Sequence, residues 1–348
     1  MASRVARGRS MRAAFYKEQG PARDVLKIGE QPKPEPGPGE VRVRLRTSGV
    51  NPSDWKSRRG GFGRGMVAPL VIPHSDGAGD IDAVGEGVPA SRIGERVWIW
   101  NGQWKRAFGT AAQYIALPSG QAVALPRNTD YAAGACLGIP ALTALQAVRL
   151  AQPQRESVVL VSGGAGAVGH YAVQFAKARG ARVLATVSGE AKAAHARGAG
   201  ADTVINYRTE DVGARVKALT GGRGVDAVIE VDLTANAKLL PAVLRPHGVA
   251  VVYGTGAAEA SIPASWLMLN GATLRLFLIY DISAADRAAV LDELDTLLAQ
   301  GRLVHASSTL PDESLFASRN SARATARWPA SPRSLAPCCT PAALHRRD

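Results

Sequence analysis

The chain has 348 residues, of which 46% are hydrophobic and 20% are charged, and this composition excludes a wholly disordered protein. At roughly 100–200 residues per domain, the length predicts two domains. No run of about 18 apolar residues occurs, so the sequence predicts no membrane-spanning segment.

The net charge of +13 would indicate a nucleic-acid partner if the charge covered a folded surface. Much of it lies at the two ends instead. Residues 1–12 carry four arginines and no acid, and residues 306–348 carry six arginines against three acids. The nearly 300 residues between them retain a charge of +6, which argues against nucleic acid as the partner.

The three cysteines, Cys136, Cys338 and Cys339, form no CxxC pair and no disulfide framework, which favours a reducing, cytoplasmic setting. The basic start of the chain is followed by no apolar stretch and is therefore not a secretory signal. We interpret residues 1–11 as a disordered extension.

Residues 12–130 predict a β-rich domain. The stretch EVRVRLRTSGV at 40–50 alternates apolar residues with arginines, which is the period of a half-exposed strand. The Pro/Gly-rich segment 31–40 before it is expected to be a loop. Several short runs that end at Gly or Pro follow, and this pattern is typical of a barrel.

Residues 131–280 predict a different architecture, because apolar runs alternate with amphipathic segments. A strand that is apolar on both faces suits a buried parallel sheet, and six such strands predict an α/β, doubly wound nucleotide-binding domain. The six expected strands are 157–163, 182–188, 202–207, 225–231, 248–254 and 273–280.

The last part of the chain changes character once more. Residues 281–305 predict a helix, at 284–301, which ends at a glycine and returns the chain to the first domain. Residues 306–348 have no helical or strand period and no final apolar strand, so we expect disorder there. A frameshift in the coding sequence is our hypothesis for this segment.

The segment after the first expected parallel strand contains Gly164-x-Gly166-x-x-Gly169 and then opens an expected helix. In this context the three glycines indicate a dinucleotide site. Gly164 is expected to permit the tight turn, Gly166 the approach of a pyrophosphate, and Gly169 the packing of the helix on the strand. The helix N-terminus would offer unpaired N–H groups to the phosphates.

The end of the second expected strand indicates which dinucleotide binds. A site for NAD requires an acid there, and the residues 186–188 include none. Glu190 fits better as a first-turn acid behind a Ser188 N-cap. Lys192 and Tyr207 could instead meet a 2′-phosphate, so the sequence predicts NADPH. The alternative, that Lys192 is an ordinary solvated lysine, stays open.

Six segments in this order carry a family resemblance: GVNPSDWKSR, IPHSDGAGDIDAVGEGV, GIPALTAL, GGAGAVG, GADTVINYRTED and VVYG. Over roughly residues 11–305 the sequence resembles the zinc-free quinone oxidoreductase (zeta-crystallin-like) branch of the medium-chain dehydrogenase/reductase superfamily. The resemblance implies a GroES-like β-barrel domain beside a six-strand Rossmann domain, a homodimer, and hydride transfer from NADPH to a quinone or enone. The alternative is an NADPH-binding relative without catalysis, with a structural or RNA-binding role.

The resemblance also implies roles for individual residues. Asn51 is expected to face the nicotinamide and the substrate oxygen, and Thr143 is expected to support the nicotinamide end. The implied cofactor contacts are Lys56, Ala165, Gly166, Ala167, Val168, Ser188, Lys192, Tyr207, Asn236, Tyr253 and Gly254.

No metal is predicted. Zinc-dependent relatives carry a cysteine in place of Asn51 and a His-Glu pair in place of Ser75 and Asp76, and a catalytic zinc needs three such ligands. His74 lies one position away, and we interpret it as a loop residue or as a wall of the substrate pocket. Without a Lewis acid, hydride transfer requires an acceptor that is already electron-poor, such as a quinone or an enone.

Overall fold

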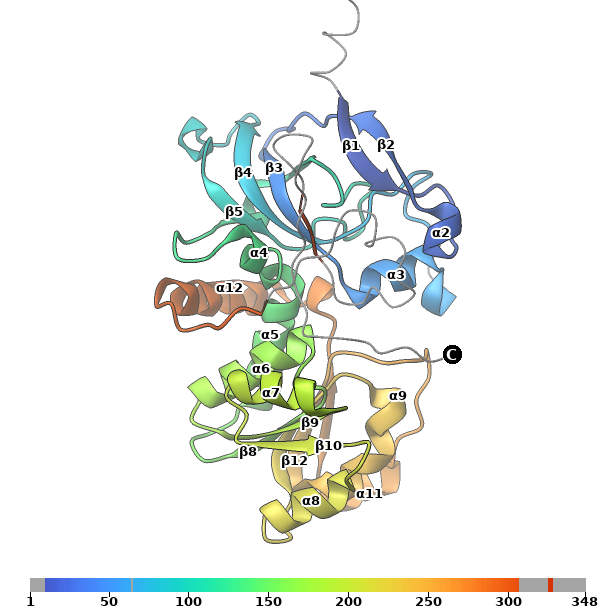
Figure 1. Ribbon diagram of the computed structural model, residues 1–348, viewed down its shortest axis with the longest axis vertical. Coiled ribbons are helices and arrows are strands. Elements are labelled where there is room, and N and C mark those ends of the chain that lie inside the picture. The colour runs from blue at the N-terminus through green and yellow to red at the C-terminus, as the bar shows by residue number, and fades with distance from the viewer. Residues whose placement is uncertain (1–9, 64, 307–324, 328–348) are drawn as a thin grey trace, which may run out of the picture. The chain divides into compact units, whose positions relative to one another are not determined.

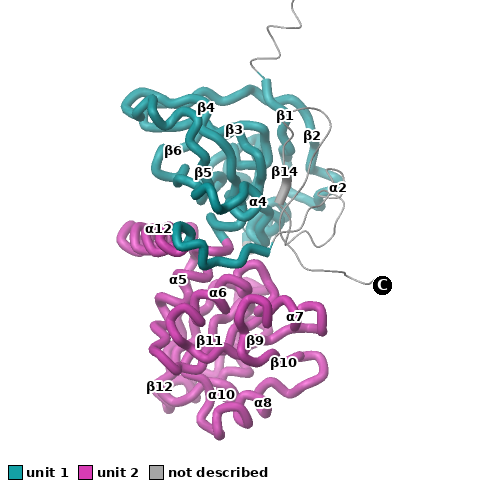
Figure 2. Tube along the Cα trace, turned by 60° about the vertical axis from the view of Figure 1, so that its left-hand side comes forward, with its two compact units in different colours: residues 1–139, 298–340 teal, residues 140–297, 341–348 magenta. Residues whose placement is uncertain are grey.

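The computed structural model describes residues 10–63, 65–306 and 325–327, which form two compact units (Figures 1 and 2). The first unit runs to Ile139 and resumes at Leu298. The second unit runs from Pro140 to Leu297. Among the described residues no helix is long and apolar enough to cross a membrane.

The first unit is built from antiparallel strands. A two-stranded sheet pairs β1 with β2, and a larger sheet has the order β14-β3-β4-β5-β7, with β6 also paired to β3. The strands are β1 (Ser10–Phe15), β2 (Lys27–Pro32), β3 (Glu40–Gly49), β4 (Asp76–Val84), β5 (Arg96–Ile99), β6 (Tyr114–Pro118), β7 (Ala122–Ala124) and β14 (Thr325–Arg327). The α-helices are α2 (Ala22–Val25), α3 (Pro52–Arg58) and α4 (Tyr131–Gly134).

The alternating stretch forms β3, as predicted. Its apolar side chains, among them Val43 and Leu45, are buried in the core of this unit. One arginine on the other face departs from the expected exposure, because Arg42 is only 8% exposed. Its guanidinium donates to Asp82 at 2.8 Å and to Glu35 at 2.6 Å, so the buried charge is paired.

Two expected boundaries in the first unit were wrong. The disordered extension was expected to include residues 10 and 11, but β1 begins at Ser10 and Met11 is 1% exposed. The expected loop 31–40 starts later than predicted, because Gln31 pairs with Met11 within the β1–β2 ladder. Pairing between these two strands overrides the local loop signal. Residues 1–9 lie outside the described part of the chain.

Helix α4 belongs to the first unit, although the sequence placed the change of domain after residue 130. The Asp130 carboxylate caps the helix by accepting from the Ala133 amide at 2.7 Å. The Thr47 hydroxyl donates to the Tyr131 carbonyl at 2.5 Å, and the Tyr131 hydroxyl donates to Asp80. These bonds attach the helix to β3 and β4, so the first unit extends to Ile139.

The second unit contains the predicted six-stranded parallel sheet, in the order β10-β9-β8-β11-β12-β13 (Figure 1). Counted along the chain this is the order 3-2-1-4-5-6 of a doubly wound dinucleotide-binding fold, which confirms the predicted fold class. The strands are β8 (Val158–Val161), β9 (Arg182–Val187), β10 (Thr203–Asn206), β11 (Val225–Glu230), β12 (Leu244–Val252) and β13 (Thr273–Leu276). The α-helices are α5 (Leu142–Ala151), α6 (Ala167–Ala178), α7 (Glu190–Gly198), α8 (Val212–Leu219), α9 (Leu233–Asn236), α10 (Leu240–Val243), α11 (Ala264–Leu269) and α12 (Ala284–Ala299).

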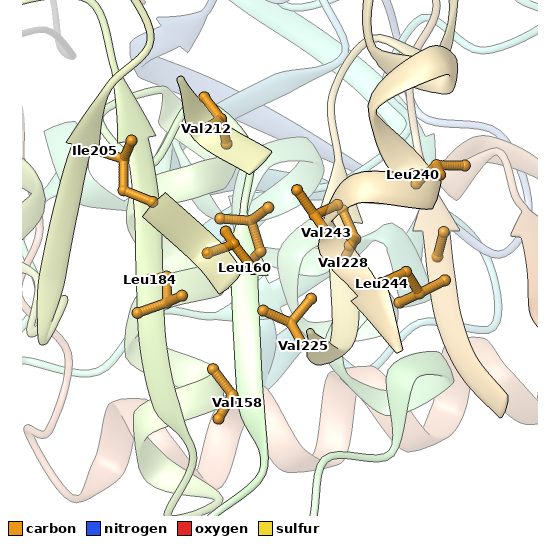
Figure 3. Close-up of a cluster of buried hydrophobic side chains, with 12 residues drawn as sticks. Val158, Leu160, Leu184, Ile205, Val212, Val225, Val228, Leu240, Val243 and Leu244 are labelled. Atoms are coloured by element: carbon orange, nitrogen blue, oxygen red, sulfur yellow. The ribbon is translucent and has the colours of Figure 1, made fainter. Parts of the chain in front are cut away.

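The core of the second unit forms where strand side chains meet the helices (Figure 3). Leu160 and Leu184, on adjacent strands, are 1% and 0% exposed, and Val216 of α8 is 0% exposed. Each fully buried side chain of this size contributes roughly 1.5–3 kcal/mol to the burial of apolar surface. Continuous apolar runs therefore predicted these strands correctly.

The sixth expected strand is shorter than predicted. Strand β13 ends at Leu276, and Ile279–Asp281 form a 3-10 turn. The amide of Phe277 makes the last bond to the neighbouring strand, donating to the Val252 carbonyl at 3.1 Å. Because β12 ends at Val252, the ladder has no partner beyond this point.

The C-terminal region returns to the first unit after α12. Gly301 has a φ of +63°, consistent with the predicted glycine at the helix end. The Asn128 side chain donates to the Leu298 carbonyl at 3.1 Å. Strand β14 pairs antiparallel with residues 47–49 of β3, so the prediction of disorder after residue 306 was wrong for these three residues. The remainder of that prediction lies outside the described residues.

Candidate functional site

The glycine-rich turn joins β8 to α6, and its geometry explains the small residues. A Cβ on Gly169 would lie 2.2 Å from the Gly163 carbonyl oxygen, and one on Gly164 would lie 2.6 Å from the Cβ of Ala185. The positive φ of the turn, +67°, belongs to Gly163. Gly164, which was expected to allow the tight turn, is instead required by its contact with the neighbouring strand.

The turn ends at Gly166, which is the N-cap of α6 and offers no side chain to the helix. The amides of the next residues, Ala167, Val168 and Gly169, stand in the first turn, where N–H groups have no intrahelical acceptor. Together with the helix dipole they make a site for an anionic group. Ala165, 4% exposed, lies beside them.

Three predicted cofactor residues come together at the ends of β9 and β10. The Lys192 Nζ donates to the Ser188 Oγ at 2.7 Å. Tyr207 follows β10, and its amide donates to the Val187 carbonyl at 3.1 Å, while 53% of the residue is exposed. Because β9 and β10 are parallel neighbours, an ammonium and two hydroxyl-bearing residues stand at one edge of the sheet.

One acid close to this edge in the sequence, Glu190, does not pair with Lys192. Glu190 is the first residue of α7, and its carboxylate pairs with Arg197 on the same helix at 2.8 Å. The expected Ser188 N-cap was wrong. Gly189 occupies the cap position, which leaves the Ser188 hydroxyl to accept from Lys192.

A buried carboxylate that the sequence analysis missed organises the end of β11. Glu230 is 2% exposed, and it accepts from the Ser162 hydroxyl at 2.7 Å and from the Asn236 amide at 2.8 Å. Burial raises the pKa of Glu230, and these two bonds oppose the rise. The signal in the sequence that could have identified Glu230 is its position as an acid within the otherwise apolar run VDAVIEV.

Two further predicted cofactor residues share the edge of the sheet with Glu230. The Tyr253 amide donates to the Glu230 carbonyl at 3.1 Å. A Cβ on Gly254 would lie 2.2 Å from the Val231 carbonyl oxygen, so this close approach requires glycine. The structure therefore brings most of the predicted cofactor residues to the carboxyl edge of one sheet, where such folds bind ligands.

In the first unit, Asn51 is held by two aspartates. Its side-chain amide donates to the Asp76 Oδ2 at 2.7 Å, and its backbone amide donates to the Asp54 Oδ2 at 2.6 Å. Asn51 is 4% exposed, and it precedes Pro52, the first residue of α3. Both its backbone and its side chain are thereby fixed.

Both aspartates are buried, and neither forms an ion pair within the described part of the chain. Burial raises the pKa of Asp54 to about 7, against the hydrogen bond from Asn51, which lowers it. Burial raises the pKa of Asp76 well above its usual range, and the nearby Asp54 adds to the rise. Burial thus favours the protonated form of Asp76 beside Asn51.

A chain of hydrogen bonds also reaches the backbone carbonyl of Asp76. The His74 Nδ1 is 2.9 Å from the Ser48 Oγ, which is 2.8 Å from the Thr110 Oγ1. The Thr110 hydroxyl donates to the backbone carbonyl of Asp76. Burial, with a smaller effect of Arg58, lowers the pKa of His74 to about 3. The sequence analysis considered His74 only, and no pattern identified Ser48 or Thr110.

The remaining predicted residues are divided between the two units. Lys56 is half-buried on α3, with its Nζ 5.9 Å from the Trp55 ring centre. Thr143 is 4% exposed on α5 of the second unit. The roles expected for Asn51, Lys56 and Thr143 stay predictions.

The residues at the position where zinc-dependent relatives hold zinc do not fit the metal in this chain. Zinc prefers thiolate, imidazole and carboxylate ligands, whereas this position offers the amide of Asn51, the hydroxyl of Ser75 and the carboxyl of Asp76, which is already bonded to Asn51. Among the described residues, no group of three or more His, Cys, Asp or Glu side chains could hold a metal ion.

Comparison with known proteins agrees with this architecture. Residues 37–127 match the alcohol dehydrogenase GroES-like domain, and residues 167–296 match the zinc-binding dehydrogenase domain. A chloroplast envelope quinone oxidoreductase homolog of Arabidopsis thaliana is 30% identical over 265 residues, covering 70% of this chain and 78% of that protein. The chain belongs to the quinone oxidoreductase branch of the medium-chain dehydrogenase/reductase superfamily.

Other members of the superfamily match over shorter stretches. The quinone oxidoreductase of Rattus norvegicus is 33% identical over 201 residues, which cover 56% of this chain and 60% of the rat protein. A 2-haloacrylate reductase of a Burkholderia species is 32% identical over 197 residues, which cover 55% of this chain and 57% of that protein. The chain thus spans less than two thirds of the length of these two relatives.

A solved structure of a mycobacterial protein complexed with NADPH superposes with a TM-score of 0.74 at 27% identity. It covers 86% of this chain and 91% of the mycobacterial chain. This chain therefore shares the fold of that protein over most of its length.

Proposed function

We propose that this chain is an NADPH-dependent reductase that transfers hydride to quinones or to activated alkenes and enones without zinc. The observation that carries the proposal is the Lys192–Ser188 pair at the end of β9, where an enzyme that prefers NAD would place a carboxylate. A lysine and a hydroxyl suit a ribose 2′-phosphate, which an acidic residue would repel.

The second unit supplies the residues that would hold NADPH. The turn around Gly166 and the first amides of α6 would bind the pyrophosphate. Lys192, Ser188 and Tyr207 would bind the 2′-phosphate. NADPH supplies the hydride when it is bound.

The first unit supplies the environment of the acceptor. An amide side chain has two N–H donors, and Asn51 gives one of them to Asp76. We assign the second N–H to the substrate oxygen, on which negative charge develops during hydride transfer. Since the donors around Asn51 do not suit zinc, the acceptor has to be electron-poor without the help of a metal. The names of the rat and Burkholderia relatives support quinones and activated alkenes as its two classes.

The proposal is tested by following NADPH oxidation with a panel of quinones and enones, in parallel with NADH and after treatment with a strong chelator. We expect turnover that favours NADPH and is insensitive to the chelator. Binding of NADPH without turnover of any acceptor would contradict the proposal and favour a non-catalytic, structural or RNA-binding role. A reducing, cytoplasmic setting stays a proposal: the sequence contains no disulfide framework, but Cys136 is disulfide-bonded in the structure.

A further inference from the structure

The hydrogen bonds around Ser48 determine which nitrogen of His74 carries its proton. The backbone carbonyl of Asp76 can only accept a hydrogen bond, so the Thr110 hydroxyl donates its single proton to that carbonyl. The Ser48 hydroxyl must then donate to Thr110. Ser48 is left as the acceptor for His74, and the bond at Nδ1 is therefore an N–H donation from the ring.

This assignment also determines the state of the other ring nitrogen of His74, Nε2. A neutral imidazole has a single N–H, so the Nε2 of His74 presents a lone pair. Burial keeps the ring neutral, since the pKa of His74 is lowered to about 3. The bond to Ser48 is the only hydrogen bond of this ring among the described residues. Nε2 is thus a hydrogen-bond acceptor with no donor among the residues that the structure describes.

The backbone of His74 shows that the ring is held in place at a cost. Its φ is +77°, a left-handed conformation that glycine adopts freely and a histidine adopts with strain. Such strain persists where the surroundings enforce it, and it concentrates at functional sites. His74 is only 9% exposed, so the ring keeps a single orientation.

The ring belongs to the same network as Asn51. Asp76 receives the Asn51 amide on its side chain and the Thr110 hydroxyl on its backbone carbonyl. One residue therefore connects a donor, the second N–H of Asn51, with an acceptor, the Nε2 of His74. A substrate that meets both groups needs an oxygen for the first and an O–H or N–H for the second.

We propose that the Nε2 of His74 determines specificity by accepting a hydrogen bond from substrates that carry a hydroxyl or N–H group beside the reducible quinone or enone. This inference rests on the proposed reductase function. A substrate that offers only carbonyl or ether oxygens at this point buries Nε2 without a donor, which disfavours it. His74 supplies no proton to the product. The hydrogen-bond chain from its Nδ1 through Ser48 and Thr110 ends at the backbone carbonyl of Asp76, which has no proton to pass on.

The test compares a hydroxymethyl-substituted benzoquinone with its methyl ether, which has the same ring but no O–H. We expect wild-type kcat/KM to favour the alcohol by about tenfold, the size of one lost hydrogen bond to a buried acceptor. In His74→Gly, which removes the ring and suits the positive φ, the preference disappears. Equal preference in wild type and His74→Gly would overturn the proposal.

Two Ser48 variants separate a specific role from general damage. In Ser48→Ala no acceptor fixes Nδ1–H, so the neutral ring can place its proton on Nε2 and tolerate the ether. The preference for the alcohol then falls, mainly through a lower KM for the ether. Ser48→Thr keeps the hydroxyl and is expected to restore the preference. An unchanged preference in Ser48→Ala would contradict the tautomer argument.

Nitrogen NMR of histidine-labelled full-length protein gives a readout that does not depend on turnover. Wild type should show a protonated Nδ1 and an unprotonated Nε2 for His74, and a protonated Nε2 would overturn the proposal. If no acceptor is reduced, the reductase function fails, and equilibrium binding of the two quinones to wild type and His74→Gly still tests the preference. Equal affinities would then overturn the role of His74.

Discussion

The ammonium group of Lys192 occupies the first turn of α7, where the helix dipole disfavours a cation, and within the described residues it donates to a hydroxyl, that of Ser188. A bound 2′-phosphate would compensate this arrangement. We expect Lys192→Met to raise KM for NADPH by roughly tenfold, as a hydrogen bond to a charged group is worth about 1.5–3 kcal/mol. KM for NADH should change little, and steady-state kinetics with both cofactors measure the difference.

The control for this substitution is Arg197→Met on the same helix. Arg197 pairs with Glu190 instead of facing the strand end, so it should leave the preference between the two cofactors unchanged. A parallel loss of affinity for NADPH and NADH in Lys192→Met would contradict the assignment of Lys192 to the 2′-phosphate.

The carboxyl group of Asp54 gives the molecule a pH-dependent stability. Its pKa rises from 3.8 to about 7 on folding, so between these values the unfolded chain releases its proton before the folded chain does. The free energy of unfolding should therefore fall by up to about 1.4 kcal/mol per pH unit from pH 4 to pH 7 and then level off. In Asp54→Asn this contribution is absent.

Chemical denaturation of wild type and Asp54→Asn at several pH values measures this effect. The stability of the variant relative to wild type should grow as the pH rises from 4 to 7. Asp24→Asn, at a side chain that is 54% exposed, is the control and should show no such trend. A difference between wild type and Asp54→Asn that is constant with pH would contradict the raised pKa of Asp54.

At the scale of single residues, sequence reasoning found the groups that stand next to a recognisable pattern. Lys192 and Tyr207 were identified because each lies at the end of an apolar run. His74, Ser48 and Thr110 are distant in the chain and join only when β3 and β4 pair and the segment before β6 folds over them. No short spacing in the sequence predicts that these three side chains form hydrogen bonds with one another.

Helix α6 and helix α7 offer a matched pair of glycines. A Cβ on Gly169 would lie 2.2 Å from the Gly163 carbonyl oxygen, whereas one on Gly198 would meet nothing within 4 Å. Gly169→Ala should destabilise the protein by about 1–3 kcal/mol through overpacking and should abolish stabilisation by NADPH. Gly198→Ala should be neutral or stabilising by up to about 1 kcal/mol, because alanine favours a helix.

Thermal unfolding with and without NADPH measures both effects. Wild type and Gly198→Ala should each gain stability when the cofactor is present. If Gly169→Ala gained the same stabilisation by NADPH, the turn before α6 would not be the phosphate site.

At the scale of elements, continuous apolar runs predicted the strands of the parallel sheet, because burial on both faces leaves a direct mark on sequence. Element ends were harder to predict. Strand β13 ends where its partner β12 ends, and Met11 and Gln31 are strand residues because they pair with each other. A strand boundary depends on the neighbour, which a single segment of sequence does not contain.

At the scale of the whole molecule, the last strand of the parallel sheet leaves an apolar edge. Strand β13 has one partner among the described strands, and Leu276 on it is 60% exposed. Nearby on α11, Met268 and Leu269 are 82% and 87% exposed. Unpaired edges of this kind readily accept another strand. We expect a second copy of this chain to cover the edge and form the predicted homodimer.

Light scattering after size-exclusion chromatography tests this expectation. Wild type should be a dimer, and Leu276→Lys, which places a charge on the edge, should be a monomer. Ile93→Lys, at an apolar residue of the first unit that is 52% exposed, is the control and should remain dimeric. A monomeric wild type would contradict the assignment of β13 as the edge at which two copies of the chain meet.

The sequence by itself determined the order of a β-rich unit and a dinucleotide-binding unit, the glycine turn, and the position of a lysine in the helix after the second parallel strand. Each of these features depends on hydrophobic periodicity or on a short motif, which can be recognised within one segment of the sequence. Only the tertiary structure decided that Asp76 joins Asn51 to the chain of Thr110, Ser48 and His74. Buried polar groups must find partners wherever the fold provides them, and those partners are set by strand pairing over long sequence distances.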